Sequence, residues 1–253
     1  MTILERSFSK LKGRTAWITG GKRIGQAVAR ALAEQGTNII VSWRSSQKEA
    51  DEIVRSSKKL GVRALAVRAD VSNRRDTVRA LDQVLKQFRR IDILVNMASV
   101  FSSAGFSRVS EKDMETNVRA HILGTLWPIQ LAAPHMPRGS HIINVTDRTS
   151  VGRVYKNYLP YVVTKKAVEG LTRTCAVELA DRGIFVNAIA PGPLLPPDGT
   201  PSREWRALRE RSRLKYPMSD PEAVEQFALL VLYLSTVTLA SGNTYLLDQG
   251  QNL

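Results

Sequence analysis

Short apolar segments rich in β-branched residues alternate with longer segments of helical periodicity along the whole chain. An apolar run of this kind, bounded by turn residues, predicts a strand, and strands separated by helical segments predict parallel βαβ units. The pattern therefore predicts a doubly wound α/β domain, with a parallel sheet and helices on both of its faces. Seven strands are expected, at Ala16–Thr19, Ile39–Ser42, Ala64–Val67, Ile91–Val95, His141–Val145, Ile184–Ile189 and Tyr245–Leu247.

Several helices are marked by their own start and stop signals. An apolar stripe with spacing i, i+3, i+4, i+7, i+8 begins at Ile24, and Gly36 stands where a helix C-cap belongs. Ser110 and Ser219 each precede acidic residues in the pattern of a capping box, which predicts two further helix starts. The segment Phe227–Ala240 is predicted to be a buried helix, because it falls short of the roughly 18 apolar residues that a membrane span needs.

The chain shows no repeat, low-complexity run or linker, so residues 1–253 are expected to form a single domain. Pro191–Thr200 is too rich in Pro and Gly to be a helix or strand, and a substrate loop is expected at about 193–217. Within it, Ser202–Lys215 carries six basic and two acidic residues. We interpret this run as a solvated helix with Trp205 and Leu208 on its apolar side, although a basic lid over an anionic substrate is an alternative.

Charge and cysteine usage narrow the class of protein. The 253 residues include 37 Lys+Arg and 23 Asp+Glu, a net charge of +14 that raises nucleic acid as a partner. The basic residues are spread over nearly every segment, so nucleic acid is only a minor possibility and no membrane partner is expected. The lone Cys175 and a polar, basic N-terminal segment without an apolar run predict a cytoplasmic protein. The three histidines lack ligand spacing, and no metal site is expected.

The turn after the first predicted strand is glycine-rich and basic. Thr19–Gly25 reads TGGKRIG, and glycines there let a backbone approach a pyrophosphate at a helix N-terminus. The second strand is followed by Arg44 where an acid would bind a ribose 2′-hydroxyl, and Arg there accommodates a 2′-phosphate instead. With Lys22 and Arg23 beside the same turn, the sequence favours NADPH over NADH. The alternative is that Arg44 is an ordinary solvated residue.

A later helix carries Tyr161 and Lys165, which the i, i+4 spacing places on one face. Tyrosine ordinarily has a pKa near ~10, and a neighbouring cation favours the phenolate, which makes the group useful in acid–base chemistry. Asp70, Asn96 and Asp147 each close a predicted strand. Because active sites of open α/β sheets lie at the carboxyl ends of strands, these residues are expected near Tyr161.

Motifs along essentially the whole chain resemble the short-chain dehydrogenase/reductase family. They are TGGKRIG, ADVS at Ala69–Ser72, LVNMAS at Leu94–Ser99, Asn117 in METNV, INVTD at Ile143–Asp147, YVVTK at Tyr161–Lys165, NAIAPG at Asn187–Gly192 and a final YLLDQGQ. The resemblance implies a Rossmann-type fold, Tyr161 as proton donor, Lys165 as a ribose ligand that lowers the tyrosine pKa, and Asn117 in a proton relay. It also implies a homotetramer formed through long helices, one including Tyr161–Asp181. The cofactor-binding residues it implies are Gly20, Lys22, Arg23, Ile24, Gly25, Arg44, Ser45, Asp70, Val71, Asn96, Ala98, Lys165, Pro191 and Gly192.

Asp147 departs from the family pattern, which usually has Ser at this position. Pteridine reductases and dihydromonapterin reductases within the family carry Asp there, an Arg in the glycine turn, and an aromatic residue after the fourth strand. This sequence is similar, with Asp147, Arg23 and Phe101. The resemblance implies an NADPH-dependent pteridine reductase in which Asp147 bonds Tyr161, Phe101 stacks on a flat substrate, and Arg23 and Ser99 contact it.

Three features differ from that subgroup. The glycine turn is one residue shorter, Met97 replaces a second Asn, and Asp147 and Tyr161 are 14 positions apart where 13 is usual. Phe101 is alternatively plain packing under a loop, and Asp147 a surface carboxylate paired with Arg148 or Arg153. The alternative functions are reduction of a 3-oxoacyl thioester or another ketone, or a basic nucleotide- or nucleic-acid-binding protein without catalysis.

Overall fold

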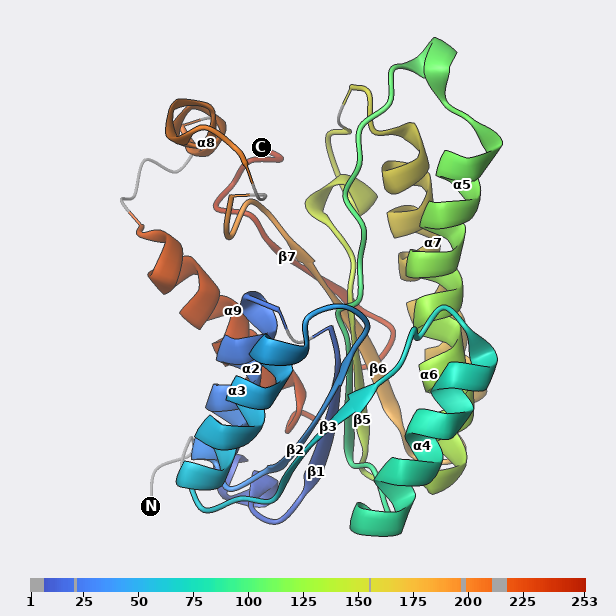
Figure 1. Ribbon diagram of the computed structural model, residues 1–253, viewed down its shortest axis with the longest axis vertical. Coiled ribbons are helices and arrows are strands. Elements are labelled where there is room, and N and C mark those ends of the chain that lie inside the picture. The colour runs from blue at the N-terminus through green and yellow to red at the C-terminus, as the bar shows by residue number, and fades with distance from the viewer. Residues whose placement is uncertain (1–6, 21, 155, 197–198, 211–217) are drawn as a thin grey trace.

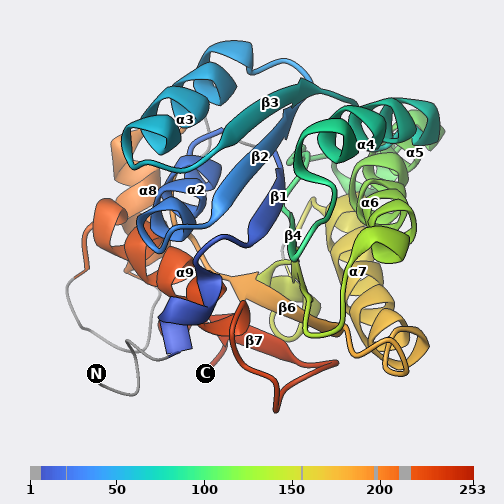
Figure 2. The ribbon, with the colours of Figure 1, turned by 90° about the horizontal axis from the view of Figure 1, so that it is seen from below.

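One parallel sheet forms the centre of the molecule, with the strand order β3-β2-β1-β4-β5-β6-β7 (Figures 1 and 2). The computed structural model describes residues 7–20, 22–154, 156–196, 199–210 and 218–253. The strands are β1 (Thr15–Thr19), β2 (Asn38–Trp43), β3 (Ala64–Arg68), β4 (Ile93–Asn96), β5 (His141–Val145), β6 (Phe185–Pro191) and β7 (Thr244–Leu247). The predicted fold class is thereby confirmed, and the fourth strand begins two residues later than predicted.

Helices cover both faces of this sheet, as Figure 2 shows from below. On one face lie α2 (Ile24–Glu34), α3 (Gln47–Lys59) and α9 (Asp220–Leu234), and on the other lie α4 (Arg74–Phe88), α5 (Glu111–Asn117), α6 (Gly124–Ala132) and α7 (Leu159–Glu178). Each layer has its own apolar core. One is built around Val28, Leu32 and Phe227, and the other around Trp17, Val84 and Ile142. Because both faces are covered, every residue of β1 and β4 is buried, which is typical of parallel sheets.

The order of the strands determines where a ligand can bind. The chain winds outward from β1 through β2 to β3 and then returns to place β4 on the other side of β1, with Thr19 opposite Asn96. The two connections leave the carboxyl ends of β1 and β4 in opposite directions and open a crevice between them. This is the topological switch point at which doubly wound sheets bind ligands.

The predicted capping signals are present. Ser110 accepts a hydrogen bond from the backbone N–H of Asp113, whose carboxylate accepts one in return from the Ser110 N–H, and Ser219 and Glu222 form the same reciprocal pair. Each box satisfies backbone donors that would otherwise lack a partner in the first turn. Gly36 follows the end of α2 with a φ of +79°, a conformation that glycine adopts without strain.

The start of α9 at Asp220 follows the predicted cap at Ser219, but the helix ends at Leu234 and so does not extend over the whole predicted segment Phe227–Ala240. The Ser235 hydroxyl donates to the carbonyl oxygen of Val231 at 2.7 Å. The residues that follow form turns, and Leu239 is almost fully exposed. The helix is also buried on one side only, because Leu229 and Tyr233 are exposed.

The segment after β6 carries α8 (Ser202–Arg209), which lies near the start of α9 (Figure 1). The indole N–H of Trp205 donates to the carboxylate of Asp220, and Arg209 donates to the same carboxylate, so α8 is tied to the first turn of α9. Trp205, predicted on the apolar side of this helix, is buried. Residues 197–198 and 211–217 of the predicted substrate loop lie outside the described residues.

Two further sequence predictions concern the class of protein. Cys175 is buried in α7, as expected of a small core residue, and the cytoplasmic location inferred from it stays a prediction. Among the described helices, none has the length and apolar character needed to cross a membrane.

Candidate active site

The turn between β1 and α2 brings the chain close to the end of β4. Gly20 has a φ of +83°, and a Cβ at this position would lie 3.2 Å from the backbone of Ala98. A Cβ on Gly25 would lie 2.6 Å from the carbonyl oxygen of Gly20. Both positions therefore require glycine to keep the turn flat against the strand ends. Above this turn the backbone remains accessible to a ligand.

Arg23 stands at the N-cap of α2 in a conformation that a side-chain-bearing residue seldom adopts, with φ 59° and ψ −98°. Its side chain makes no capping hydrogen bond and instead donates to the carbonyl oxygen of Pro196. The first turn of α2 thus has no side-chain cap, although the Gly25 and Gln26 amides donate to the carbonyl oxygens of Lys22 and Arg23. A helix N-terminus of this kind favours an anion.

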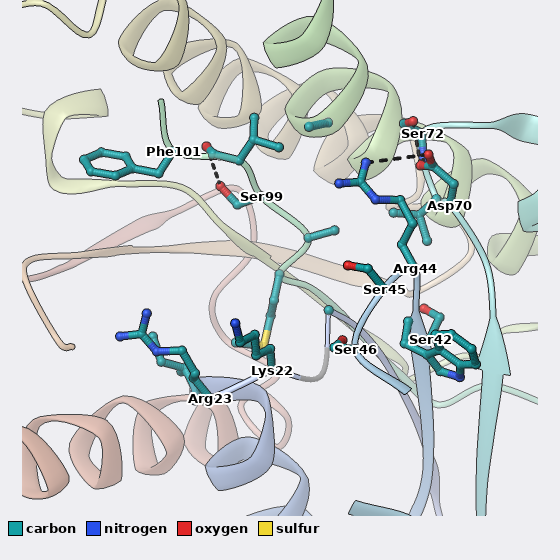
Figure 3. Close-up of a pocket in the computed structure, with 18 of the residues that line it drawn as sticks. Lys22, Arg23, Ser42, Arg44, Ser45, Ser46, Asp70, Ser72, Ser99 and Phe101 are labelled. Carbon is teal, nitrogen blue, oxygen red and sulfur yellow. Dashed lines mark hydrogen bonds and ion pairs between the residues drawn. The ribbon is translucent and has the colours of Figure 1, made fainter. Parts of the chain in front are cut away.

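A cavity of about 680 Å³ extends along the crevice, within the size range of ligand sites. In Figure 3, Lys22 and Arg23 lie on one side of it, Ser99 and Phe101 on the other, and Arg44 at a far end. Thirteen lining residues come from the glycine turn and the ends of β2 and β3, among them Gly20, Ile24, Ser45, Asp70 and Val71. The other eight follow β4 in the sequence and include Ala98 and Tyr161. The turn, the ends of β2 and β3, and the loop after β4 thus share one cavity.

The far end of the cavity combines a cation with a carboxylate. Arg44 Nη1 lies 3.7 Å from Asp70 Oδ2, and the Arg44 side chain is 63% exposed. Asp70 is held in place because its Oδ1 accepts hydrogen bonds from the Ser72 amide at 3.0 Å and the Ser72 hydroxyl at 2.6 Å. An exposed ion pair of this kind contributes little to stability, so the guanidinium remains available to an anionic ligand.

The opposite end is built around a tyrosine and a carboxylate. The Tyr161 hydroxyl donates to Asp147 Oδ2 at 2.9 Å, and Asp147 Oδ1 accepts a hydrogen bond from the Thr149 amide at 2.8 Å. Asp147 follows β5 and caps the short helical turn Arg148–Ser150, which explains why its side chain points to α7. The carboxylate is therefore half-buried and bonded to the tyrosine that faces the cavity.

Lys165 lies one turn beyond Tyr161 and is buried. Its Nζ donates to the carbonyl oxygen of Val145 at 2.9 Å and lies 5.8 Å from the centre of the Tyr161 ring. Burial lowers the pKa of Lys165 to about 8, and the nearby Asp147 carboxylate opposes that shift. Since this pKa is above 7, the protonated form of Lys165 predominates at neutral pH. The tyrosine therefore has a buried cation beside it.

Asn117 is the last residue of α5, and a wide π-helical turn follows over Val118–Leu123. Its Nδ2 donates to the Asp113 carbonyl oxygen at 2.9 Å, while its buried Oδ1 has no hydrogen-bond partner among the described residues. Buried polar atoms are almost always partnered, and π-helical turns occur frequently at functional sites. Both observations indicate that the Asn117 side chain has a role beyond packing.

Aromatic rings surround Tyr161. Phe101 stacks on Tyr158 with ring centres 4.6 Å apart and meets Tyr161 edge-on at 4.9 Å, and it is 47% exposed. Phe101 therefore packs under its loop and also borders the cavity at the tyrosine end. Stacking of Phe101 on a bound substrate stays a prediction.

One residue of this cluster was missed in the sequence. His121 was set aside because it lacks metal-ligand spacing, yet its ring lies 5.4 Å from that of Tyr161 and contacts Ser99, Val100 and Thr164. The available signal was its position four residues after Asn117, on the same side of the helical segment. Among the described residues no group of side chains suits a metal ion.

Not all predicted site residues line the main cavity. The predicted residues that are not among its lining residues are Gly25, Asn96, Asn117, Asp147, Lys165, Pro191 and Gly192. Gly192 lines a second cavity of about 350 Å³ beside Arg209, and a Cβ there would lie 2.9 Å from Asp248. Asn96 is buried, with its Nδ2 bonded to Asn144 and its Oδ1 without a partner among the described residues.

The residues fit a dinucleotide phosphate. Glycine at Gly20 and Gly25 leaves room where a side chain would collide with the turn, the start of α2 carries no side-chain cap, and cations stand at both Lys22 and Arg44. The cavity connects these groups with Tyr161. An elongated ligand with a central pyrophosphate and an additional phosphate matches this arrangement.

Comparison with known proteins agrees with this geometry. A family model described as Enoyl-(Acyl carrier protein) reductase matches residues 20–252. The L-rhamnose 1-dehydrogenase (NADP(+)) of Thermoplasma acidophilum is 32% identical over 247 residues, which cover 94% of this chain and 96% of that protein. The 3-oxoacyl-(acyl-carrier-protein) reductase FabG of Staphylococcus epidermidis is 36% identical over 183 residues, covering 71% of this chain and 74% of that protein.

Solved structures are similar over nearly the full length. A short chain dehydrogenase from Burkholderia cenocepacia in complex with NADP has a TM-score of 0.87 at 28% identity, covering 96% of this chain and 99% of that chain. A blue fluorescent protein from a metagenomic library, in complex with NADPH, has a TM-score of 0.88 at 28% identity with the same coverage. The family match over residues 20–252 and these relatives show that the chain belongs to the short-chain dehydrogenase/reductase family of oxidoreductases.

Proposed function

We propose that the protein is an NADPH-dependent reductase of a flat, pteridine-like heterocycle such as a dihydropterin or dihydrofolate. The observation that carries this proposal is the hydrogen bond from Tyr161 to Asp147. A carboxylate accepts hydrogen bonds and donates none unless it is protonated. A group of this kind suits a substrate rich in N–H donors better than one that offers only a carbonyl oxygen.

The cofactor is NADP(H), as it is for the rhamnose dehydrogenase and for the two similar structures described above. In this chain the start of α2, with Gly20, Ile24 and Gly25, would hold the pyrophosphate. Arg44, Ser45 and Lys22 would hold the 2′-phosphate, with Asp70 and Val71 beside the adenine. Asn96, Ala98, Pro191 and Gly192 would border the nicotinamide half.

NADPH supplies the hydride when it is bound, and the residues of the chain manage the proton. Tyr161 donates its hydroxyl proton to the substrate atom that becomes negative when the hydride arrives. Lys165 stabilises the resulting phenolate and binds the nicotinamide ribose. Asp147 would take up a proton from solvent and pass it to the Tyr161 phenolate, and Asn117 would hold the relay that brings this proton in.

The walls of the cavity favour a flat substrate. Phe101 offers a ring face beside Tyr161, and stacking contributes roughly 0.5–1.5 kcal/mol beyond the burial of area. Arg23 reaches over the turn to Pro196 and so stands between the cofactor and the segment after β6. Ser99, on the loop after β4, adds a hydroxyl to the same wall.

A ketone substrate is the second candidate. The observation that favours it is the 36% identity to a 3-oxoacyl-(acyl-carrier-protein) reductase, together with the packing of Phe101 on Tyr158 in this structure. The non-catalytic alternative loses its basis, because the chain belongs to a family of oxidoreductases and positions a tyrosine and lysine together.

A substrate panel separates the candidates. Purified protein is expected to oxidise NADPH with dihydrobiopterin or dihydrofolate, and faster than with acetoacetyl thioesters or quinones, measured by the loss of absorbance of NADPH. Asp147→Ser, which restores a hydroxyl that can donate to a carbonyl oxygen, should lower turnover of the pterin and raise that of the thioester. Turnover of the thioester alone by the unmodified protein would overturn the pteridine proposal.

The proposed role of Tyr161 as proton donor can be tested with the neighbouring Tyr158 as a control. Tyr161→Phe removes the proton donor and should lower kcat by about 10²–10⁴-fold, the usual contribution of general acid catalysis. Tyr158→Phe removes the same atom from the ring that stacks on Phe101 and should change kcat by less than about fivefold, a factor worth ~1 kcal/mol. Equal losses in the two variants, measured at saturating NADPH, would contradict the role of Tyr161.

The 2′-phosphate role of Arg44 is tested by charge reversal. Arg44→Asp should raise the KM for NADPH about 10–100-fold relative to NADH, because it removes a charge-assisted hydrogen bond and places a carboxylate beside Asp70. Arg55→Asp makes the same change in net charge at an exposed position of α3 and should leave the NADPH to NADH preference unaltered. An unaltered preference in Arg44→Asp as well assigns the phosphate to other residues.

A homotetramer built through α7 is part of the proposal. Val163 and Val177 are exposed apolar residues on this helix, 50% and 77% accessible in the single chain. Light scattering should give the mass of four chains, and Val177→Asp should give a smaller species. Leu239→Asp, an equally apolar and exposed position outside α7, is the control that should keep the assembly. A monomeric unmodified protein would rule the tetramer out.

A further inference from the structure

His121 is the one buried titratable group of the described active site that the proposed chemistry does not use. It lies in the π-helical turn after Asn117 and is 1% exposed. Its Nδ1 is 2.8 Å from the Thr164 hydroxyl, and its Nε2 is 2.9 Å from the Ser99 hydroxyl. The ring therefore joins α7, in the turn that carries Tyr161 and Lys165, to the loop after β4.

Counting protons along this chain of contacts identifies the tautomer. The Thr164 hydroxyl has a single proton, and it donates to the Pro160 carbonyl oxygen at 2.7 Å, the usual bond of a helical threonine to residue i−4. Thr164 must then accept from His121, so Nδ1 carries the proton. Burial and the charge of Lys165 lower the pKa of His121 to about 3, which leaves one proton on the ring at neutral pH.

With Nδ1 protonated, Nε2 is an acceptor. The Val100 amide points at it from 3.3 Å, and the Ser99 hydroxyl is the better placed second donor at 2.9 Å. The Val100 carbonyl oxygen, 3.1 Å from Nε2, would be a partner only in the other tautomer. The competing bond from the Ser99 hydroxyl to that carbonyl is longer, at 3.3 Å. The Ser99 proton is therefore committed to His121, and the lone pairs of Ser99 remain for a ligand in the cavity.

The same ring also holds the catalytic tyrosine. His121 meets the Tyr161 ring edge-on at 5.4 Å, and Phe101 meets it edge-on at 4.9 Å. The loop from Ser99 to Phe101 and the tyrosine are thus positioned by one buried side chain. An additional backbone bond from Ala104 to Asn157 fixes the far end of the loop against the start of α7.

We propose that His121 is a positioning residue whose Nδ1–H form makes Ser99 a hydrogen-bond acceptor toward the substrate and keeps the Phe101 loop in register with Tyr161. The wall of the cavity then selects substrates that present an N–H group at Ser99, as Asp147 does beside Tyr161. The kinetic readout rests on the proposed reductase function, whereas the state of the ring does not.

The tautomer is tested without any substrate. In protein labelled with ¹⁵N-histidine, the His121 signals are assigned by their loss in His121→Gln, since the chain has only three histidines. The expected spectrum has a protonated Nδ1 and an unprotonated, strongly downfield Nε2 between pH 6 and 8. A protonated Nε2, or a charged ring in this range, would overturn the proposal whatever the protein reduces.

The positioning role is tested by paired substitutions, with the substrate that the panel identifies. His121→Leu keeps an apolar side chain but no partners, and should raise the KM of the substrate about tenfold, a loss of ~1.4 kcal/mol, with a smaller change in kcat. His121→Gln offers an amide donor and acceptor and should restore KM to within about threefold, or ~0.7 kcal/mol. If the two variants have equal KM values, or His121→Leu has the unmodified value, the proposal fails.

Two controls separate positioning from loss of structure. His141→Leu removes the other deeply buried histidine, which stacks on Phe185 at the amino end of β5, and should leave KM unchanged even if the protein is less stable. Ser99→Ala should raise KM in the unmodified protein and have little further effect in His121→Leu, because His121 acts through Ser99. Additive effects of the two substitutions would show that His121 does not act through this hydroxyl.

Discussion

The pairing of β1 with β4 is the constraint on which the rest of the molecule depends. It places Thr19 opposite Asn96, and the Thr19 hydroxyl then accepts a hydrogen bond from the Met97 amide at 3.0 Å. With the strand ends tied together, the glycine turn lies flat against Ala98, and the loop after β4 turns away toward Tyr161. A shift of one residue in this register would reverse the side chains of β4 and remove Asn96 from the site. The crevice thus follows from the order of the strands and does not depend on the side chains that line it.

Charge is distributed unevenly along this crevice. Exposed cations lie where phosphates are expected, at Lys22 and Arg44, and the buried cation Lys165 lies one helical turn from Tyr161. Burial lowers the pKa of Lys165 to about 8, and Asp147 limits that shift. A lysine with a pKa near the working pH is more sensitive to its surroundings than an exposed one. The carboxylate therefore has two effects in this site, since it bonds the tyrosine and also favours the charged form of the lysine. Only part of the net charge of +14 is accounted for by these residues.

Periodic features of the sequence predicted the fold and the main site, and contacts between distant segments limited the prediction. Strand positions and the capping boxes at Ser110 and Ser219 follow from local patterns, and they agree with the structure. The end of α9 at Leu234 does not, because the apolar residues continue to Ala240 in the sequence and do not mark where the last helical turn ends. His121 was missed for a different reason. Its partners Ser99 and Thr164 are 22 and 43 positions away, and only the packing of the π-helical turn against α7 brings them together.

On the proposals above, substrate choice depends on the hydrogen-bonding character of two groups near Tyr161. Asp147 accepts a hydrogen bond from the Tyr161 hydroxyl, and the geometry around His121 directs the Ser99 proton away from the cavity. A ketone offers only acceptor oxygens. Near these groups it would find one donor, the Tyr161 hydroxyl, and only after that hydroxyl has left Asp147. Leaving buried acceptors unpaired costs about 1–3 kcal/mol each, a penalty that a substrate with N–H groups facing both acceptors avoids. On the proposed function, the same penalty would separate this site from that of a 3-oxoacyl reductase with the same fold, since exchanging one hydroxyl for a carboxylate changes which substrates leave the site unsatisfied.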